Sequence, residues 1–240
     1  MDPIQAIVLA IVQGLSEFLP ISSSGHLILI PHFLGWSDQG LAFDVAEHLG
    51  TLLALLVYFR RQLGTMATAW FDSVLRRTHT RDSRLAWQIL VATVPVGLVG
   101  LLFDDYIEAH LRNPLFVAGT LTVFGLLMYA ADRYGRGNKD EYSLGWPQVI
   151  AIGCAQALAL MPGTSRSGIT MTAGRALGLS RSGAARFSFL LAIPGIGAAG
   201  AYEGLKLVTS TEPVDWQPMV VGVVFAALSG IACIHLLIRF

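Results

Sequence analysis

Ionisable side chains lie within segments that are otherwise apolar enough to enter a membrane. They are Glu17, His26, Asp44, Glu47, His48 and Arg166. A charge at the centre of a bilayer costs about 2.5–3.5 kcal/mol on insertion scales, so four of them facing lipid would cost roughly 10–14 kcal/mol. That penalty is comparable to the stability of a whole domain. We therefore expect these groups to face one another or a water-filled cavity.

The spacing of these residues favours one shared cavity. Gln13 and Glu17 are four positions apart, so they lie on one face of a helix. Asp44, Glu47 and His48 also share one helix face, because His48 is four positions and Glu47 three positions beyond Asp44. We expect Glu17 to belong to the site itself. Asp44, Glu47 and His48 are expected to lie next to it and to support the residues that bind substrate.

Hydroxyl-rich breaks interrupt two of the apolar segments. The first runs from Leu19 to Gly25 and the second from Met161 to Gly168, and a helix is expected to start after each. Free backbone N–H groups at a helix start attract anions, and arginine binds phosphate well. The breaks supply these candidate ligands for an anion: Ser22, Ser23, Ser24, Thr164, Ser165, Arg166, Ser167 and Thr170.

This pattern predicts a phosphate site and leaves its chemistry open. Carboxylates repel phosphate unless a cation intervenes, so we expect Mg²⁺ or Ca²⁺ held by Glu17. His26 follows Ser23 by three positions, which suits a hydroxyl nucleophile with a base. The serines would serve equally well as helix caps.

Apolar stretches close to 20 residues long predict about five membrane spans. They fall at 41–59, 85–103, 115–131, 184–205 and 219–238. The breaks divide segments 4–34 and 147–177 into halves of about three turns, which is typical of re-entrant helix pairs. The predicted fold is an all-α polytopic membrane protein with a single membrane domain over 1–240.

The two broken segments resemble each other, which predicts inverted repeats over 1–133 and 146–240. Gln13 corresponds to Gln156, and Ser22 to Ser165. If 60–84 is cytoplasmic, 13 of the 16 Lys and Arg residues lie in cytoplasmic segments, as the positive-inside rule requires. The first pair then enters from the outer side, and the site opens to the periplasm. The repeat also predicts a sixth span, for which we find no candidate after 219–238.

Composition excludes other classes of protein. Hydrophobic residues make up 54% of the chain and charged residues 13%, against about 25% charged in an average soluble domain. A water-soluble enzyme is therefore excluded. Lys and Arg together number 16, as do Asp and Glu, so no basic excess is present for binding nucleic acid.

Four stretches of the sequence resemble one bacterial family. They are QGLSEFLPISSSGH at 13–26, FDVAEHLGT at 43–51, PGTSRSGIT at 162–170 and RFSFLLAIP at 186–194. Together they look like the signature segments of the undecaprenyl-diphosphate phosphatase family, the bacitracin-resistance type of membrane phosphatase. The resemblance runs from about residue 3 to residue 239.

The resemblance implies an enzyme of the bacterial plasma membrane. Such an enzyme hydrolyses the C55 diphosphate lipid carrier to its monophosphate and phosphate, recycles the carrier for cell-wall synthesis and confers bacitracin resistance. The family's E-x-x-x-E motif falls on Gln13 and Glu17, its serine on Ser23, its histidine on His26 and its arginine on Arg166. The first glutamate is thus a glutamine here, and Asp44 or Glu47 would have to replace it. The family's usual last span, with a Tyr-Arg motif, has no counterpart within residues 1–240, which leaves open a shorter member of the family or a chain that continues.

We therefore expect a polyprenyl diphosphate substrate among membrane lipids, and the sequence leaves a homodimer open. Ser23 would attack the terminal phosphorus with His26 or Glu17 as base, although water or His26 fits equally well as nucleophile. A transporter or flippase for a phosphorylated lipid or another anion is the alternative, because inverted repeats and broken helices are typical of transporters. The residues expected to bind the diphosphate are Arg166, Gln13, Ser22, Ser24, Ser165, Ser167 and Thr170.

Overall fold

Helices account for nearly all the regular structure of the chain. The computed structural model describes residues 1–37, 39–111, 114–135, 137–209 and 216–239, and in that part only an isolated bridge between Lys139 and Leu179 has β character. The α-helices are α1 (Pro3–Ser16), α2 (Ser23–Leu34), α3 (Leu41–Tyr58), α4 (Arg60–Leu75), α5 (Arg81–His110), α6 (Pro114–Tyr134), α7 (Trp146–Ala157), α8 (Arg166–Ala176), α9 (Arg181–Thr209) and α10 (Trp216–Arg239).

The structure confirms the prediction of an all-α polytopic membrane protein. Among the described residues, α5, α6, α9 and α10 contain segments long and apolar enough to cross a membrane. The pair α3 and α4 adds a fifth span if it counts as one broken span. The five predicted stretches therefore coincide with α3, α5, α6, α9 and α10. Pro194 does not interrupt α9, which continues to Thr209.

Segment 60–84 contains a helix that the sequence analysis did not anticipate. Helix α4 begins at Arg60, directly after α3, and the two helices are bent by 79° at Phe59. Arg, Gln, Leu, Met and Ala are good helix formers, so this charged segment keeps helical structure beyond the apolar one. Thr80 and Ser83 then form a capping box that starts α5.

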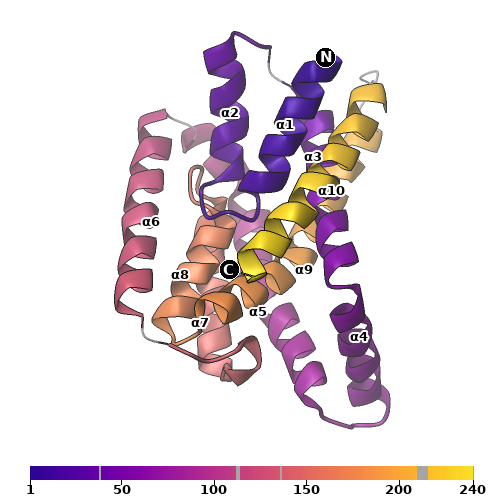
Figure 1. The fold of residues 1–240 in the computed structure, drawn as a ribbon, viewed down its shortest axis with the longest axis vertical. Helices are drawn as coiled ribbons and strands as arrows, with labels where there is room; N and C mark the ends of the chain where they lie inside the picture. The colour runs from indigo at the N-terminus through magenta and orange to yellow at the C-terminus, as the bar shows by residue number, and fades with distance from the viewer. Residues whose placement is uncertain (38, 112–113, 136, 210–215, 240) are drawn as a thin grey trace.

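The two broken segments enter the helix bundle from opposite ends. Figure 1 shows α1 and α2 at the end of the molecule that carries the N-terminus, and α7 and α8 towards the other end. A turn at 17–22 separates α1 from α2, and 158–165, which includes a short 3₁₀-helix, separates α7 from α8. This arrangement brings both breaks to the middle of the bundle. The inverted repeat stays a prediction.

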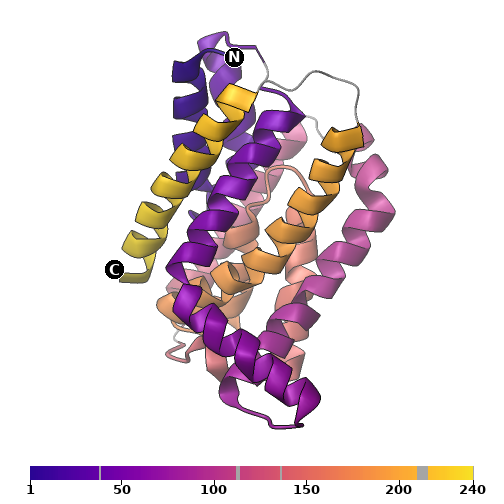
Figure 2. The ribbon, with the colours of Figure 1, turned by 90° about the vertical axis from the view of Figure 1, so that its right-hand side faces the viewer.

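Close helix packing fixes the position of α1. In Figures 1 and 2, α10 lies along α1 and α3, and small residues form the contact. A Cβ atom added at Gly14 would lie 2.5 Å from the carbonyl oxygen of Ala226, and one at Gly50 would lie 2.5 Å from that of Val223. Small residues allow such close approach of backbones in membrane proteins. The end of α1 is therefore held rigidly at the first break.

Candidate active site

Glu17 forms the centre of a buried cluster of polar side chains. Its Oε1 accepts a 2.6 Å hydrogen bond from Arg166 Nη2, which is also an ion pair. Its Oε2 accepts hydrogen bonds from Ser23 Oγ at 2.7 Å and from Gln13 Nε2 at 3.2 Å. His48 Nε2 lies 4.0 Å from the same oxygen. The Glu17 side chain is 7% exposed, so this carboxylate is shielded from bulk water but surrounded by donors.

Helix ends position the central residues. Glu17 follows the last residue of α1 and lies one turn beyond Gln13, while Ser23 is the first residue of α2. Arg166 is the first residue of α8. Two helix N-termini therefore converge on the carboxylate, and their free N–H groups give this region a positive potential.

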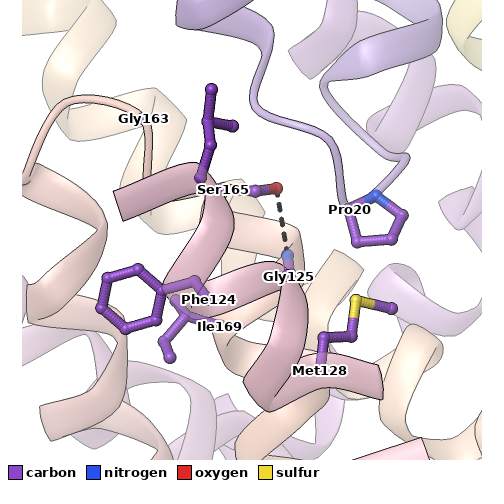
Figure 3. A pocket seen from close by; sticks show the side chains of 9 residues that line it. Pro20, Phe124, Gly125, Met128, Gly163, Ser165 and Ile169 are labelled. Atoms are coloured by element: carbon purple, nitrogen blue, oxygen red, sulfur yellow. Dashed lines mark hydrogen bonds between the residues drawn. The ribbon is translucent and has the colours of Figure 1, made fainter. Parts of the chain in front are cut away.

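The two breaks touch each other directly. Ser167 Oγ donates a 3.0 Å hydrogen bond to the carbonyl oxygen of Leu19. Figure 3 shows Pro20 of the first break opposite Ser165 of the second, across a pocket of about 30 Å³ that α6 helps to line. A Cβ atom added at Gly168 would lie 3.4 Å from that of Pro20. The contact fixes the distance between Glu17 and Arg166, which are far apart in the sequence.

The second break is locked by its own hydrogen bonds. Ser165 Oγ accepts from the N–H of Gly168 at 3.1 Å and so caps α8. Gly163 has φ of +86°, and a Cβ atom there would lie 2.6 Å from the carbonyl oxygen of Val117. Thr120 Oγ1 donates to the carbonyl oxygen of Pro162 at 2.6 Å. This segment is a scaffold that holds Arg166 in place.

The first break is held less completely. Ser22 has φ of +65°, which is strained for a residue with a side chain. Its side chain does not cap α2, and its carbonyl oxygen accepts from His26 Nδ1 at 2.8 Å. The first N–H groups of α2 therefore have no side-chain acceptor at the cap position. Backbone strain of this kind occurs often at functional sites.

A cavity of about 480 Å³ opens in front of this cluster. Its volume lies within the range of small-molecule sites, about 300–1,000 Å³. Eight of the predicted residues line it: Glu17, Ser22, Ser23, Ser24, His48, Thr164, Ser165 and Arg166. The structure thus gathers the charged pair and most of the break hydroxyls around one space.

Other predicted residues lie behind the cavity wall. Gln13 contacts Glu17 from within α1. Thr170 Oγ1 is buried and lies 2.7 Å from Ser188 Oγ, so its hydroxyl packs between α8 and α9. Ser167 Oγ donates its hydrogen bond to the carbonyl oxygen of Leu19, and His26 Nδ1 donates to that of Ser22.

The supporting group at 44–48 is divided by the structure. His48 reaches the cavity, whereas Asp44 Oδ1 accepts from Gln39 Nε2 at 2.9 Å. Glu47 is fully buried, and neither of its carboxylate oxygens has a hydrogen-bond partner in the described part of the chain. The shared helix face therefore contributes one side chain to the site, not three.

Sequence reasoning missed the far walls of the cavity. Thr93, Gly97 and Gly100 of α5 and Gly195 and Tyr202 of α9 also line it. A signal for them exists, because glycines inside apolar helices commonly mark a close approach or a space for a ligand.

The Glu17 carboxylate suits a divalent cation for which substrate phosphates supply further ligands. No group of three or more His, Cys, Asp or Glu side chains that could hold a metal occurs in the described ranges. Mg²⁺, however, is commonly bound by one or two carboxylates together with substrate phosphates. Gln13 Oε1 is buried beside Glu17 without a hydrogen-bond partner in the described structure, and it is the kind of oxygen that such a cation binds.

Comparison with known proteins identifies the family. Residues 6–240 match the family described as "Bacitracin resistance protein BacA". The chain is 57% identical to "Undecaprenyl-diphosphatase 2" of Stutzerimonas stutzeri, with all of this chain and 90% of that protein covered. It is 53% identical to "Undecaprenyl-diphosphatase" of Nitrosococcus oceani, covering all of this chain and 91% of the relative. "Undecaprenyl-diphosphatase" of Colwellia psychrerythraea is 55% identical, over 98% of this chain and 89% of that protein. The buried Glu17–Arg166 pair between two broken helices thus lies in a member of the BacA family, and the chain belongs to that family.

Proposed function

We propose that the protein hydrolyses undecaprenyl diphosphate to undecaprenyl phosphate and phosphate in the bacterial plasma membrane, and thereby supplies lipid carrier for cell-wall synthesis and confers bacitracin resistance. The relatives named undecaprenyl-diphosphatase support this activity. The observation that carries the chemistry is the hydrogen bond from Ser23 Oγ to Glu17 Oε2, at the wall of a cavity that also presents Arg166. A hydroxyl beside a carboxylate and an arginine is suited to phosphoryl transfer.

Arg166 and the start of α2 bind the diphosphate in this proposal. Arg166 is paired with Glu17 in the structure, and diphosphate oxygens compete for its guanidinium. The uncapped N–H groups at the start of α2 bind the terminal phosphate. Binding thereby moves Arg166 from Glu17 to the substrate and leaves the carboxylate free to accept a proton.

Ser23 is the nucleophile and Glu17 the base. Ser23 Oγ attacks the terminal phosphorus while its proton passes to Glu17 Oε2. The bond from that phosphorus to the bridging oxygen breaks, and the electron pair leaves with undecaprenyl phosphate. Glu17 returns this proton to the departing phosphate oxygen. Water then attacks the phosphoserine and gives a proton to Glu17, the bond from phosphorus to Ser23 Oγ breaks, and Ser23 Oγ takes the proton back from Glu17 as phosphate is released. His26 is bonded to the Ser22 carbonyl, so Glu17 is better placed than His26 to serve as base.

Glu17 would hold a Mg²⁺ or Ca²⁺ ion, which would neutralise charge on the diphosphate when bound. Gln13, at the position of the first family glutamate, supports Glu17 from behind the cavity wall through the hydrogen bond from its Nε2. The substrate phosphates complete the set of ligands in this proposal.

The cavity opens to the periplasmic side in this proposal. Basic residues such as Arg76, Arg77 and Arg81 lie at the turn between α4 and α5, at the opposite end of the molecule from the C-terminal end of α9, whose residues line the cavity (Figure 2). The positive-inside rule places that turn in the cytoplasm. In a Cys154→Ala background, His110→Cys should react with an impermeant thiol reagent in whole cells, and His79→Cys should not. The reverse labelling pattern would contradict this orientation.

Phosphate release in detergent tests the activity. Purified protein is given undecaprenyl diphosphate with Mg²⁺ or with EDTA, beside Arg166→Ala. We expect release with Mg²⁺, loss of release with EDTA, and loss in the variant. A transporter needs a membrane and would release no phosphate in detergent. A well-folded wild type that releases none would overturn the proposed function.

A further inference from the structure

The cavity has an apolar half that the chemistry above does not use. One face of α5 lines it with Thr93, Val96, Gly97, Gly100 and Leu101, at helical positions i, i+3, i+4, i+7 and i+8. This face extends for about 12 Å along the helix axis.

Helix α9 supplies the opposite wall with the same spacing. Gly195, Ala198, Ala199, Tyr202 and Glu203 line the cavity from this helix. Helices α5 and α9 contact each other and run side by side in Figure 2. The two helices therefore form a groove that is apolar apart from Thr93, Tyr202 and Glu203, and Glu17, Ser23 and Arg166 line the same cavity. We call this groove the α5–α9 groove.

Missing side chains create the width of the groove. A Cβ atom added at Gly97 or at Gly195 would meet no atom within 4 Å, so each glycine borders open space. Glycine inside a helix costs about 1 kcal/mol relative to alanine. Helix packing therefore does not explain Gly97 and Gly195, because each lines the cavity and neither makes a close contact.

The groove also reaches the outside of the bundle. Leu101 lines it and is 77% exposed, and its neighbours Leu98 and Leu102 are exposed as well. A surface of exposed leucines on a membrane-spanning helix faces lipid. The groove thus connects the polar cluster with the lipid phase.

We propose that the α5–α9 groove binds the first isoprene units of the prenyl chain, and that Gly97 and Gly195 determine whether a long-chain diphosphate can enter. The inference rests on the proposed function and extends it to the recognition of the lipid tail. A diphosphate held at Arg166 has its alkyl chain attached directly to it, so the chain must follow the apolar wall of the same cavity. The groove ends at lipid, where the rest of a 55-carbon chain stays in the bilayer.

Leucine substitutions test the groove without disturbing the polar cluster. Gly97→Leu and Gly195→Leu fill open space, and leucine favours helix, so both variants should fold. Gly197→Leu is the matched control, because a Cβ atom there also meets nothing within 4 Å and Gly197 does not line the cavity. Thermal unfolding in detergent checks that all three are folded.

Phosphate release is then measured with the C55 diphosphate and with a C5 prenyl diphosphate. We expect kcat/KM for the C55 substrate to fall about tenfold or more in both groove variants. The value for the C5 substrate should change by less than about twofold, and Gly197→Leu should match the wild type with both. Equal losses for both substrates, or no loss in a folded groove variant, would overturn the inference. A wild type that releases phosphate from neither substrate would instead overturn the proposed function.

Discussion

Each break contains a pair of serines whose hydroxyls contact each other, Ser22 with Ser24 and Ser165 with Ser167, but the other hydrogen-bond partners of the two breaks differ. In the second break, Ser165 caps the backbone of α8 and Ser167 binds the carbonyl oxygen of Leu19. In the first break, Ser23 donates to the Glu17 carboxylate, and the side chain of Ser22 leaves the start of α2 uncapped. The second break therefore uses its hydroxyls for structure, whereas the first keeps one beside a carboxylate.

This difference assigns separate tasks to two segments of similar composition. A rigid second break fixes Arg166, because its backbone is tied to α6 and to the first break. The first break carries the base and the hydroxyl and stores strain at Ser22. In our proposal the second break presents Arg166 to the diphosphate, and the first break binds the terminal phosphate and attacks it.

Loss of the Glu17 charge should reduce both activity and stability strongly. Glu17→Gln keeps the size of the side chain but removes the base for Ser23 and the counter-ion of Arg166. We expect kcat to fall by about 10²–10⁴-fold, measured as phosphate release. The melting temperature should fall too, because the partly buried Arg166 loses its partner.

A glutamate far from the site provides the control. Glu141→Gln also alters a largely buried carboxylate near an arginine, since Glu141 Oε1 lies 3.9 Å from Arg186. Its kcat should stay within about twofold of the wild type, because Glu141 lies outside the cavity. Equal losses of kcat in the two variants would show that Glu17 acts through stability alone.

Substitutions of two arginines on α8 distinguish a loss of substrate binding from a loss of stability. Arg166→Lys keeps the charge but loses the planar fork that suits phosphate, so phosphate release should fall about 10–100-fold. Arg175→Lys should instead lower the melting temperature, because Arg175 donates to the carbonyl oxygens of Leu179 and Gly137. An Arg166→Lys variant that loses stability but not activity would remove Arg166 from the proposed diphosphate site.

The smallest effect tests the rigidity of the second break. Gly163→Ala should destabilise the protein by about 1–3 kcal/mol, because its φ is positive and its Cβ atom would press on Val117. Gly119→Ala on α6 is the control, since a Cβ atom there meets nothing within 4 Å. Thermal unfolding in detergent measures both. Equal melting temperatures would mean that the second break is not a fixed scaffold.

Much of the architecture follows from residue patterns. Apolar stretches of span length predicted the membrane helices, and Pro, Gly and Ser within two other stretches predicted the breaks. The cost of burying charge predicted that Glu17 and Arg166 would lie together, and the structure places them 2.6 Å apart. The 79° bend before Arg60 was not predicted, because residues on both sides of it favour helix.

The roles of the serines could not be derived from residue type. A serine at a helix start can cap the helix or face a cavity, and the local sequence is similar in both breaks. Tertiary contacts decide between the two, such as that of Ser167 with Leu19. The same limit applies to Glu47, which shares a helix face with His48 but is buried away from the cavity.

Alanine substitution of one serine from each break tests the comparison most directly. For Ser23→Ala and Ser165→Ala, kcat with undecaprenyl diphosphate and the free energy of unfolding are measured side by side. We predict that Ser23→Ala loses at least about 10³-fold in kcat with little change in stability. Ser165→Ala should lose about 1 kcal/mol of stability and less than about fivefold in kcat. Similar losses of kcat in both variants, or a Ser23→Ala variant with full activity, would contradict the division of tasks between the two breaks.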